Sequence, residues 1–155
     1  MAPYSVNNYF KTGCSGFQAV QNAVTRLITG ARRRDHISPV LLQLHWLPIR
    51  QRVQFKLAML VFKALHGQCL TDDCQLVAAA GRRQLRSSDA VTCSVPRTRT
   101  CLGDRAFGVA GPRLWNALPI SIRQPHLSLG QFRRALKRIY LTVSAGPSDV
   151  LFFRR

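Results

Sequence analysis

The chain has 155 residues, and 46% of them are hydrophobic, which is typical of a globular protein rather than a disordered one. No stretch approaches the roughly 18 continuous apolar residues of a membrane-spanning helix, and the N-terminus lacks the apolar core of a secretion signal. We therefore expect one intracellular domain with no membrane partner. The sequence does not distinguish the nucleus from the cytoplasm.

The excess of basic residues is the strongest feature of the composition. The 23 Lys and Arg residues face six acidic residues, all of them Asp, and the formal net charge is +17. Most basic side chains therefore cannot pair within the chain and must face solvent or an anionic partner. Nineteen of them are Arg, which binds phosphate through two parallel hydrogen bonds. This composition favours RNA or DNA as the partner, and the alternative is a basic bias without a defined site.

Residues 17–31 are predicted to form an amphipathic helix that ends at Gly30. Three arginines follow at the negative end of the helix dipole: Arg32, Arg33 and Arg34. They are either a helix-terminal charge cluster or a phosphate-binding group. The apolar residues at helical spacing are expected to form the buried face of this helix: Phe17, Val20, Val24, Leu27 and Ile28.

A second helix is predicted from Ser38, a favourable N-cap, with Pro39 in its first position. It should end near Trp46, because the residue before a proline is pushed out of helical geometry. Pro48 then opens a third helix that runs to about His66. Residues 46–48 are thus expected to form a corner between two helices, with the indole of Trp46 packed beneath the turn.

The third helix has apolar residues on both sides, which is typical of a central helix. Phe55 and Phe62 lie opposite the apolar face that contains Val61. Its remaining polar surface is predicted to be a narrow basic seam. The residues of this seam are Arg50, Arg52, Lys56 and Lys63.

Residues 67–110 have a looser pattern, with a β-like run at 90–96 and a plausible helix only around 71–80. A short helix opened by Pro112 should follow it. Leu118 and Pro119 mark a second corner, which Trp115 is expected to close.

The last predicted helix, residues 128–141, begins with a capping box of Ser128 and Gln131. Its buried face should include Phe132 and Leu136. The opposite face is predicted to be basic, with Arg133, Arg134, Lys137 and Arg138. We expect these four residues to form one phosphate-contacting surface. The three arginines at 32–34 and the basic seam of the third helix should form another.

No catalytic residues are expected. Asp72 and Asp73 resemble a polymerase metal pair, but two-metal chemistry needs a third carboxylate, and no acid lies between Asp35 and Asp72. The five cysteines contain no C-x-x-C pair and are expected to be reduced and mostly buried, so we predict no metal site. Glycine-rich nucleotide-binding motifs are absent from the sequence. The sequence therefore predicts no cofactor and no small-molecule substrate.

Several segments resemble one known family. They include "DHISPVLLQLHWLPIRQR", "FKALHG", "LRSS", "VPRTRT", "GDRAF" and "GPRLWNALP". The chain over residues 17–141 resembles the C-terminal region of a non-LTR (LINE-class) retrotransposon reverse transcriptase. The resemblance implies a helical segment that follows the polymerase and helps to hold template RNA or target DNA. The polymerase palm and the endonuclease would lie upstream of this region. The stretch "HGQCLTDDC" lacks the proline and tyrosine that are usual in the family.

The sequence thus predicts a mostly α protein, a small single-domain helical bundle with an irregular, partly extended middle segment. Residues 1–16 do not match the family and are predicted to be disordered, residues 17–141 form the domain, and residues 142–155 form a flexible tail. The expected function is that of a non-catalytic remnant that binds RNA or DNA through its phosphates, largely independently of sequence. The alternatives are a translated relic without independent function and an Arg-rich adaptor for acidic proteins. The oligomeric state does not follow from the sequence.

Overall fold

The computed structural model describes residues 11–68, 74–78 and 91–145. This part of the chain forms α-helices joined by turns, with two short 3-10 helices and no strand, so the prediction of a mostly α protein is confirmed. None of the helices described is long and apolar enough to cross a membrane. The helices are α1 (Lys11–Thr29), α2 (Ile37–Gln43), α3 (Ile49–Leu65), α4 (Phe107–Asn116) and α5 (Leu129–Ala145), and the 3-10 helices are η2 (Gly103–Arg105) and η3 (Ile120–Ile122).

The chain divides into two compact units. Unit 1 contains Met1–Phe55 and Ala135–Arg155, and unit 2 contains Lys56–Arg134. Helices α3 and α5 each contribute residues to both units. The predicted limits of the domain, residues 17 and 141, stay a prediction.

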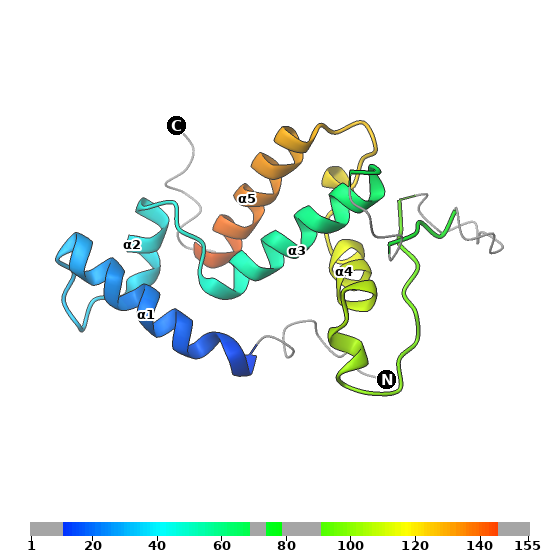
Figure 1. The fold of residues 1–155 in the computed structure, drawn as a ribbon. Helices are drawn as coiled ribbons and strands as arrows, with labels where there is room; N and C mark the ends of the chain where they lie inside the picture. The colour runs from blue at the N-terminus through cyan, green and yellow to red at the C-terminus, as the bar shows by residue number, and fades with distance from the viewer. Residues whose placement is uncertain (1–10, 69–73, 79–90, 146–155) are drawn as a thin grey trace. The chain divides into compact units, whose positions relative to one another are not determined.

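In unit 1, α1 packs against α2 (Figure 1). Helix α1 begins six residues before the predicted start and ends where the sequence predicts. Gly30 has a positive φ of 68°, and its N–H donates to Arg26 O at 2.9 Å, closing the last turn. A glycine adopts this left-handed conformation without the steric penalty of a Cβ.

The predicted orientation of α1 is wrong. Leu27 is 84% exposed and Phe17 is 69% exposed, whereas Thr25 on the polar side is fully buried. The amides of the polar side bind the corner between α2 and α3. Gln18 Oε1 accepts from the N–H of Ile49 at 2.9 Å, and Gln21 Nε2 donates to Leu47 O at 3.0 Å. The corner backbone needs hydrogen-bond partners, and the polar face of α1 supplies them.

Helix α2 begins and ends earlier than predicted. Its N-cap is His36 instead of Ser38, and its last residue is Gln43. The N–H groups of His45 and Trp46 donate to Leu42 O and Leu41 O at 2.9 and 2.8 Å, with His45 in the left-handed region. These two hydrogen bonds form a Schellman motif, which ends α2 at Gln43. The helix therefore ends before it reaches Pro48.

The corner at Pro48 is confirmed, because α3 begins at the next residue. The predicted burial of Trp46 is wrong, since 36% of its surface is exposed. The Schellman motif closes the turn with backbone hydrogen bonds, so the indole is not needed beneath it.

Unit 2 is built around three buried rings from three helices. Phe62 of α3 stacks on Phe132 of α5 with ring centroids 4.4 Å apart. Trp115 of α4 lies 5.8 Å from Phe132 and 6.4 Å from Phe62, and its indole N–H donates to Val91 O at 2.9 Å. The predicted burial of Trp115 is confirmed, since only 1% of its surface is exposed.

Helix α4 begins at Phe107, so the predicted start at Pro112 is wrong; this proline lies inside the helix and is buried. Proline removes one backbone hydrogen bond, and the packing of this helix outweighs that loss. Gly111 explains how close α3 and α4 come: a Cβ on it would lie 2.9 Å from Val61 Cγ2. The corner at Pro119 is confirmed, because α4 has ended and η3 begins at Ile120.

The middle segment, residues 67–110, is irregular where it is described, and its last part contains η2 and the beginning of α4. Leu76 and Cys93 form an isolated antiparallel bridge, with hydrogen bonds of 2.8 Å on either side of it. The side-chain amide of Asn116 both accepts from Cys93 N and donates to Cys93 O, each at 2.9 Å. A helix at 71–80 is wrong for residues 74–78, and the rest of that prediction lies outside the described residues.

The beginning of α5 is confirmed in detail. Ser128 N donates to Gln131 Oε1 at 3.0 Å and Gln131 N donates to Ser128 Oγ at 3.3 Å, which is the predicted capping box. Phe132, Leu136 and Tyr140 are buried, as the spacing predicts. The helix extends to Ala145, four residues past the predicted end.

Two buried groups that ionise at alkaline pH, the Cys93 thiol and the Tyr140 hydroxyl, should make the free energy of unfolding depend on pH. Burial raises the pKa of the Cys93 thiol from 9.0 to about 12, with a further increase from Cys74 and a smaller opposing effect of Arg123. Burial likewise raises the pKa of Tyr140 from 10.0 to about 12. Below pH 9 both groups are protonated in the folded and unfolded states. Above pH 9 the unfolded state loses protons first, so the free energy of unfolding should fall between pH 9 and 12.

Urea denaturation at a series of pH values measures this fall. Cys93→Ala and Tyr140→Phe should each make the decline shallower. A decline of unchanged steepness in both variants would contradict the assignment.

Candidate nucleic-acid interface

The three consecutive arginines lie on a fixed turn after α1. Residues 32–35, here called the arginine turn, are closed by a hydrogen bond from Asp35 N to Arg32 O at 3.0 Å. The Asp35 carboxylate accepts from the backbone N–H of Arg32 at 2.6 Å. Arg26 of α1 donates from its guanidinium to Arg32 O and Asp35 O, both at 3.4 Å. The turn is therefore held by the side chains of Arg26 and Asp35.

Arg32, Arg33 and Arg34 are all exposed, and their side chains take no part in closing the turn. Asp35 is the one acidic residue of unit 1 within the described part of the chain. The arginine turn thus presents three positive charges beside a single negative charge. This arrangement can bind an anion without any rearrangement of the backbone.

The structure does not bring the arginine turn together with the beginning of α3. The first residue of α3 is hydrogen-bonded to Gln18, whereas the arginine turn follows the other end of α1. From Gln18 to Thr29 the helix rises by about 16 Å at ~1.5 Å per residue. Arg50, which is half-buried, and the exposed Arg52 therefore form a separate basic group in unit 1.

The predicted basic seam of α3 is not its only exposed surface. Lys56 is exposed and Lys63 is half-buried, but Val53 and Leu60 are also exposed, by 36% and 45%. The exposed surface of α3 therefore contains apolar side chains as well as basic ones.

The basic face of α5 lies where the sequence predicts. Arg133, Arg134, Lys137 and Arg138 are exposed, on the side of the helix away from the buried Phe132. These four charges fall within about 7.5 Å of helix axis. A stripe of this kind is suited to a phosphate chain, which carries closely spaced negative charges.

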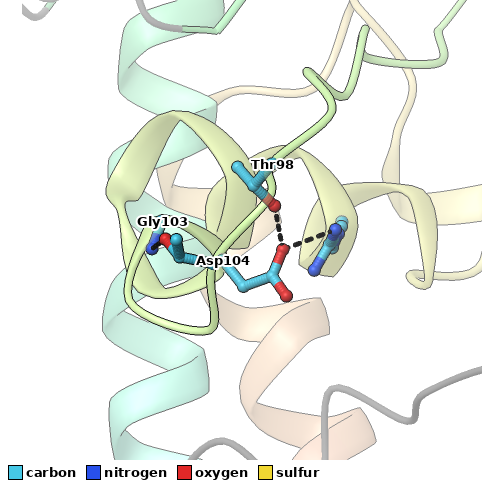
Figure 2. Close-up of polar contacts among 5 residues, drawn as sticks. Thr98, Gly103 and Asp104 are labelled. Atoms are coloured by element: carbon cyan, nitrogen blue, oxygen red, sulfur yellow. Dashed lines mark hydrogen bonds and ion pairs between the residues drawn. The ribbon is translucent and has the colours of Figure 1, made fainter.

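Sequence reasoning missed a further basic segment, the arginine loop of residues 97–105. The Thr98 hydroxyl donates to Asp104 Oδ1, which also forms an ion pair with Arg113 Nη2 at 2.9 Å (Figure 2). Gly103 N donates to Thr100 Oγ1 at 3.1 Å. The loop is thus folded back on itself and fixed to α4. Its exposed arginines are Arg97, Arg99 and Arg105.

The motif residues themselves contained a signal for this loop. Threonine alternates with arginine at 97–100, so the hydroxyls at 98 and 100 can face the rest of the loop while the guanidinium groups face solvent. Gly103 leaves the room that this needs, because a Cβ there would lie 3.2 Å from Thr100 Oγ1 and 3.3 Å from two Thr98 side-chain atoms. The inward partner, Asp104, could not be assigned from spacing alone.

Metal and thiol chemistry have no evident centre in the described residues. No group of three or more His, Cys, Asp or Glu side chains there could hold a metal ion. Cys74 and Cys93 are buried, Cys14 is half-buried and Cys101 is exposed. The expectations for Cys69, Asp72 and Asp73 lie outside the described residues.

Comparison with known proteins found no matching family model, no similar curated protein and no similar solved structure.

Proposed function

We propose that this chain is a non-catalytic protein that binds RNA or DNA through the phosphate backbone. We also propose that it derives from the post-polymerase region of a non-LTR retrotransposon reverse transcriptase, on the strength of the sequence resemblance over residues 17–141. The net charge of +17 supports an anionic partner. The binding would be largely independent of base sequence, because phosphate contacts contain no base information.

The observation that supports the proposal best is the arginine turn. Its backbone is held by Asp35 and Arg26, and three guanidinium groups are exposed on it. A solvated charge cluster needs no such fixed backbone, whereas a phosphate-binding turn gains affinity from it, because less conformational freedom is lost on binding. The arginine loop of unit 2 has the same property, since Asp104 fixes it through Thr98 and Arg113.

The salt dependence of binding tests the role of the arginine turn. Each phosphate neutralised adds about 0.7 to 0.9 to the slope of log affinity against log salt concentration. Replacing Arg32, Arg33 and Arg34 together by Gln should therefore lower this slope by roughly two to three units, for both single-stranded RNA and duplex DNA. Fluorescence anisotropy with labelled oligonucleotides, titrated at several salt concentrations, measures the slope.

The matched control is the triple replacement of the same residues by Lys, which keeps the charge and should keep most of the slope. Both triple variants should unfold at the wild-type temperature, since the side chains replaced do not hold the turn. If the Gln variant binds with the wild-type affinity and slope, the arginine turn is only a solvated cluster. That result would favour a translated relic without independent function.

A further inference from the structure

Helix α1 exposes a continuous apolar face. Val20 is 63% exposed and Ile28 is 60% exposed, values far above those of core residues. The neighbouring, polar side of the helix is fixed inward by the hydrogen bonds of Gln18 and Gln21 to the corner before α3. The apolar face therefore cannot turn inward without breaking these bonds. It consists of Phe17, Val20, Val24, Leu27 and Ile28.

The spacing of this face is that of a coiled coil. Phe17 and Val24 are seven residues apart, as are Val20 and Leu27, and the two pairs are offset by three residues. These are the a and d positions of two consecutive heptads, the pattern that packs one helix against another along a narrow seam. Ile28, at the e position after Leu27, widens this seam at its C-terminal end.

The residues that flank the seam are uncharged. Gly16 and Ala23 occupy the g positions, and Gln21 and Ile28 occupy the e positions. Charges at e and g normally select a partner of opposite charge and repel like chains. Two copies of this strongly basic protein can therefore approach along α1 without facing charges at the seam.

We propose that the apolar face of α1 pairs with α1 of a second copy of this chain. The seam is complementary to itself, as an interface with two-fold symmetry requires. The five side chains expose roughly 500 Å² per copy, somewhat less than the ~800 Å² per partner of a standard interface. The expected product is a weak dimer whose population rises with protein concentration.

The chemistry of α1 favours a second copy over a membrane surface. Helices that lie on anionic membranes have Lys and Arg along the polar face. The polar face of α1 instead has mainly amides and hydroxyls, including Gln18, Gln21 and Thr25, which face the rest of unit 1. Its Arg26 is bound to the backbone of the arginine turn.

Self-association and nucleic-acid binding should respond to salt in opposite directions. Two copies with a net charge of +17 repel each other, and salt screens this repulsion, so the dimer should become more populated as salt increases. Binding to RNA or DNA weakens with salt. The two proposals can thus fail independently.

Sedimentation equilibrium of the purified chain, free of nucleic acid, tests the dimer at about 0.15 and about 1 M salt. The wild-type mass should rise from one chain toward two with concentration, and more so at high salt. The double variant Val20→Gln and Leu27→Gln should keep the mass of one chain. The matched control is Ser15→Gln with Ala19→Gln, two exposed positions of α1 outside the seam, and it should dimerise like the wild type.

Far-UV circular dichroism should show equal helix content in the wild type and both double variants, because every replaced side chain is exposed. If the seam variant loses helix content, Phe17→Gln replaces it. A wild-type mass of one chain at every concentration and salt overturns the proposal, whether or not the protein then binds vesicles or acidic peptides. A seam variant that dimerises like the wild type also overturns it.

Discussion

Replacing Trp115 by Ala is expected to lower the free energy of unfolding by about 3–5 kcal/mol. The indole is almost fully buried, and it contacts both other rings of the unit 2 core, Phe62 and Phe132. Its removal leaves a cavity among three helices that cannot collapse without moving them. It also removes the donor that Val91 O accepts from. Urea denaturation followed by far-UV circular dichroism gives the free energy without relying on tryptophan fluorescence.

The matched control for this prediction is Trp46→Ala. Trp46 has the same sequence context, a tryptophan shortly before Leu-Pro, but it is 36% exposed, and backbone hydrogen bonds close its turn. We expect this substitution to cost only about 1 kcal/mol. Equal losses for the two variants would show that the two corners are packed alike, contrary to the structure.

The helices were predictable where their signals are local. Gly30 ends α1, Pro48 precedes α3, and Ser128 with Gln131 begins α5, because each of these residues acts on backbone groups within a few positions of itself. The start of α4 was not predictable in this way. The rule that places a proline in the first turn fails at Pro112, where the packing of Val109 and Leu114 in the core stabilises a longer helix.

Which face of a helix is buried depends on its tertiary partners. Periodicity identified the apolar face of α1 correctly but could not show that the corner before α3 requires two amides from the other face. The sequence likewise could not show that Trp115 is buried and Trp46 is partly exposed. Both follow the same local pattern, and within the described part of the chain only Trp115 has aromatic neighbours from two other helices.

The sequence predicted which basic residues are exposed, but it did not predict which of them lie together. A chain with so few acids must expose most of its arginines, and those predicted at 32–34 and on α5 are exposed. Grouping them requires distances between elements, and α1 separates the arginine turn from Arg50 and Arg52. The arginine loop was missed because Asp104 joins Thr98 to Arg113, residues that no short motif connects.

Asn116→Ala should also be strongly destabilising, by about 2–6 kcal/mol for two buried groups left without partners. Asn116 follows Trp115 at the end of α4, and its amide satisfies both backbone groups of the buried Cys93. Alanine leaves the N–H and the carbonyl oxygen of Cys93 without partners. A buried polar group without a hydrogen-bond partner costs ~1–3 kcal/mol. The extended segment around Cys93 should loosen first, which hydrogen exchange of the Cys93 amide would detect.

The Asn116→Asp variant keeps one of the two hydrogen bonds to Cys93 and removes the other. The carboxylate still accepts from Cys93 N, but its second oxygen then faces Cys93 O, and the two acceptors repel each other. Protonation restores a donor, so the carboxyl should have a raised pKa in the folded state. Folding then favours the protonated form, and the loss of stability relative to wild type should shrink as the pH falls toward 4. A deficit that stays constant between pH 7 and 4, or an Asn116→Ala variant as stable as wild type, would rule out the paired hydrogen bonds as the link between α4 and the extended segment.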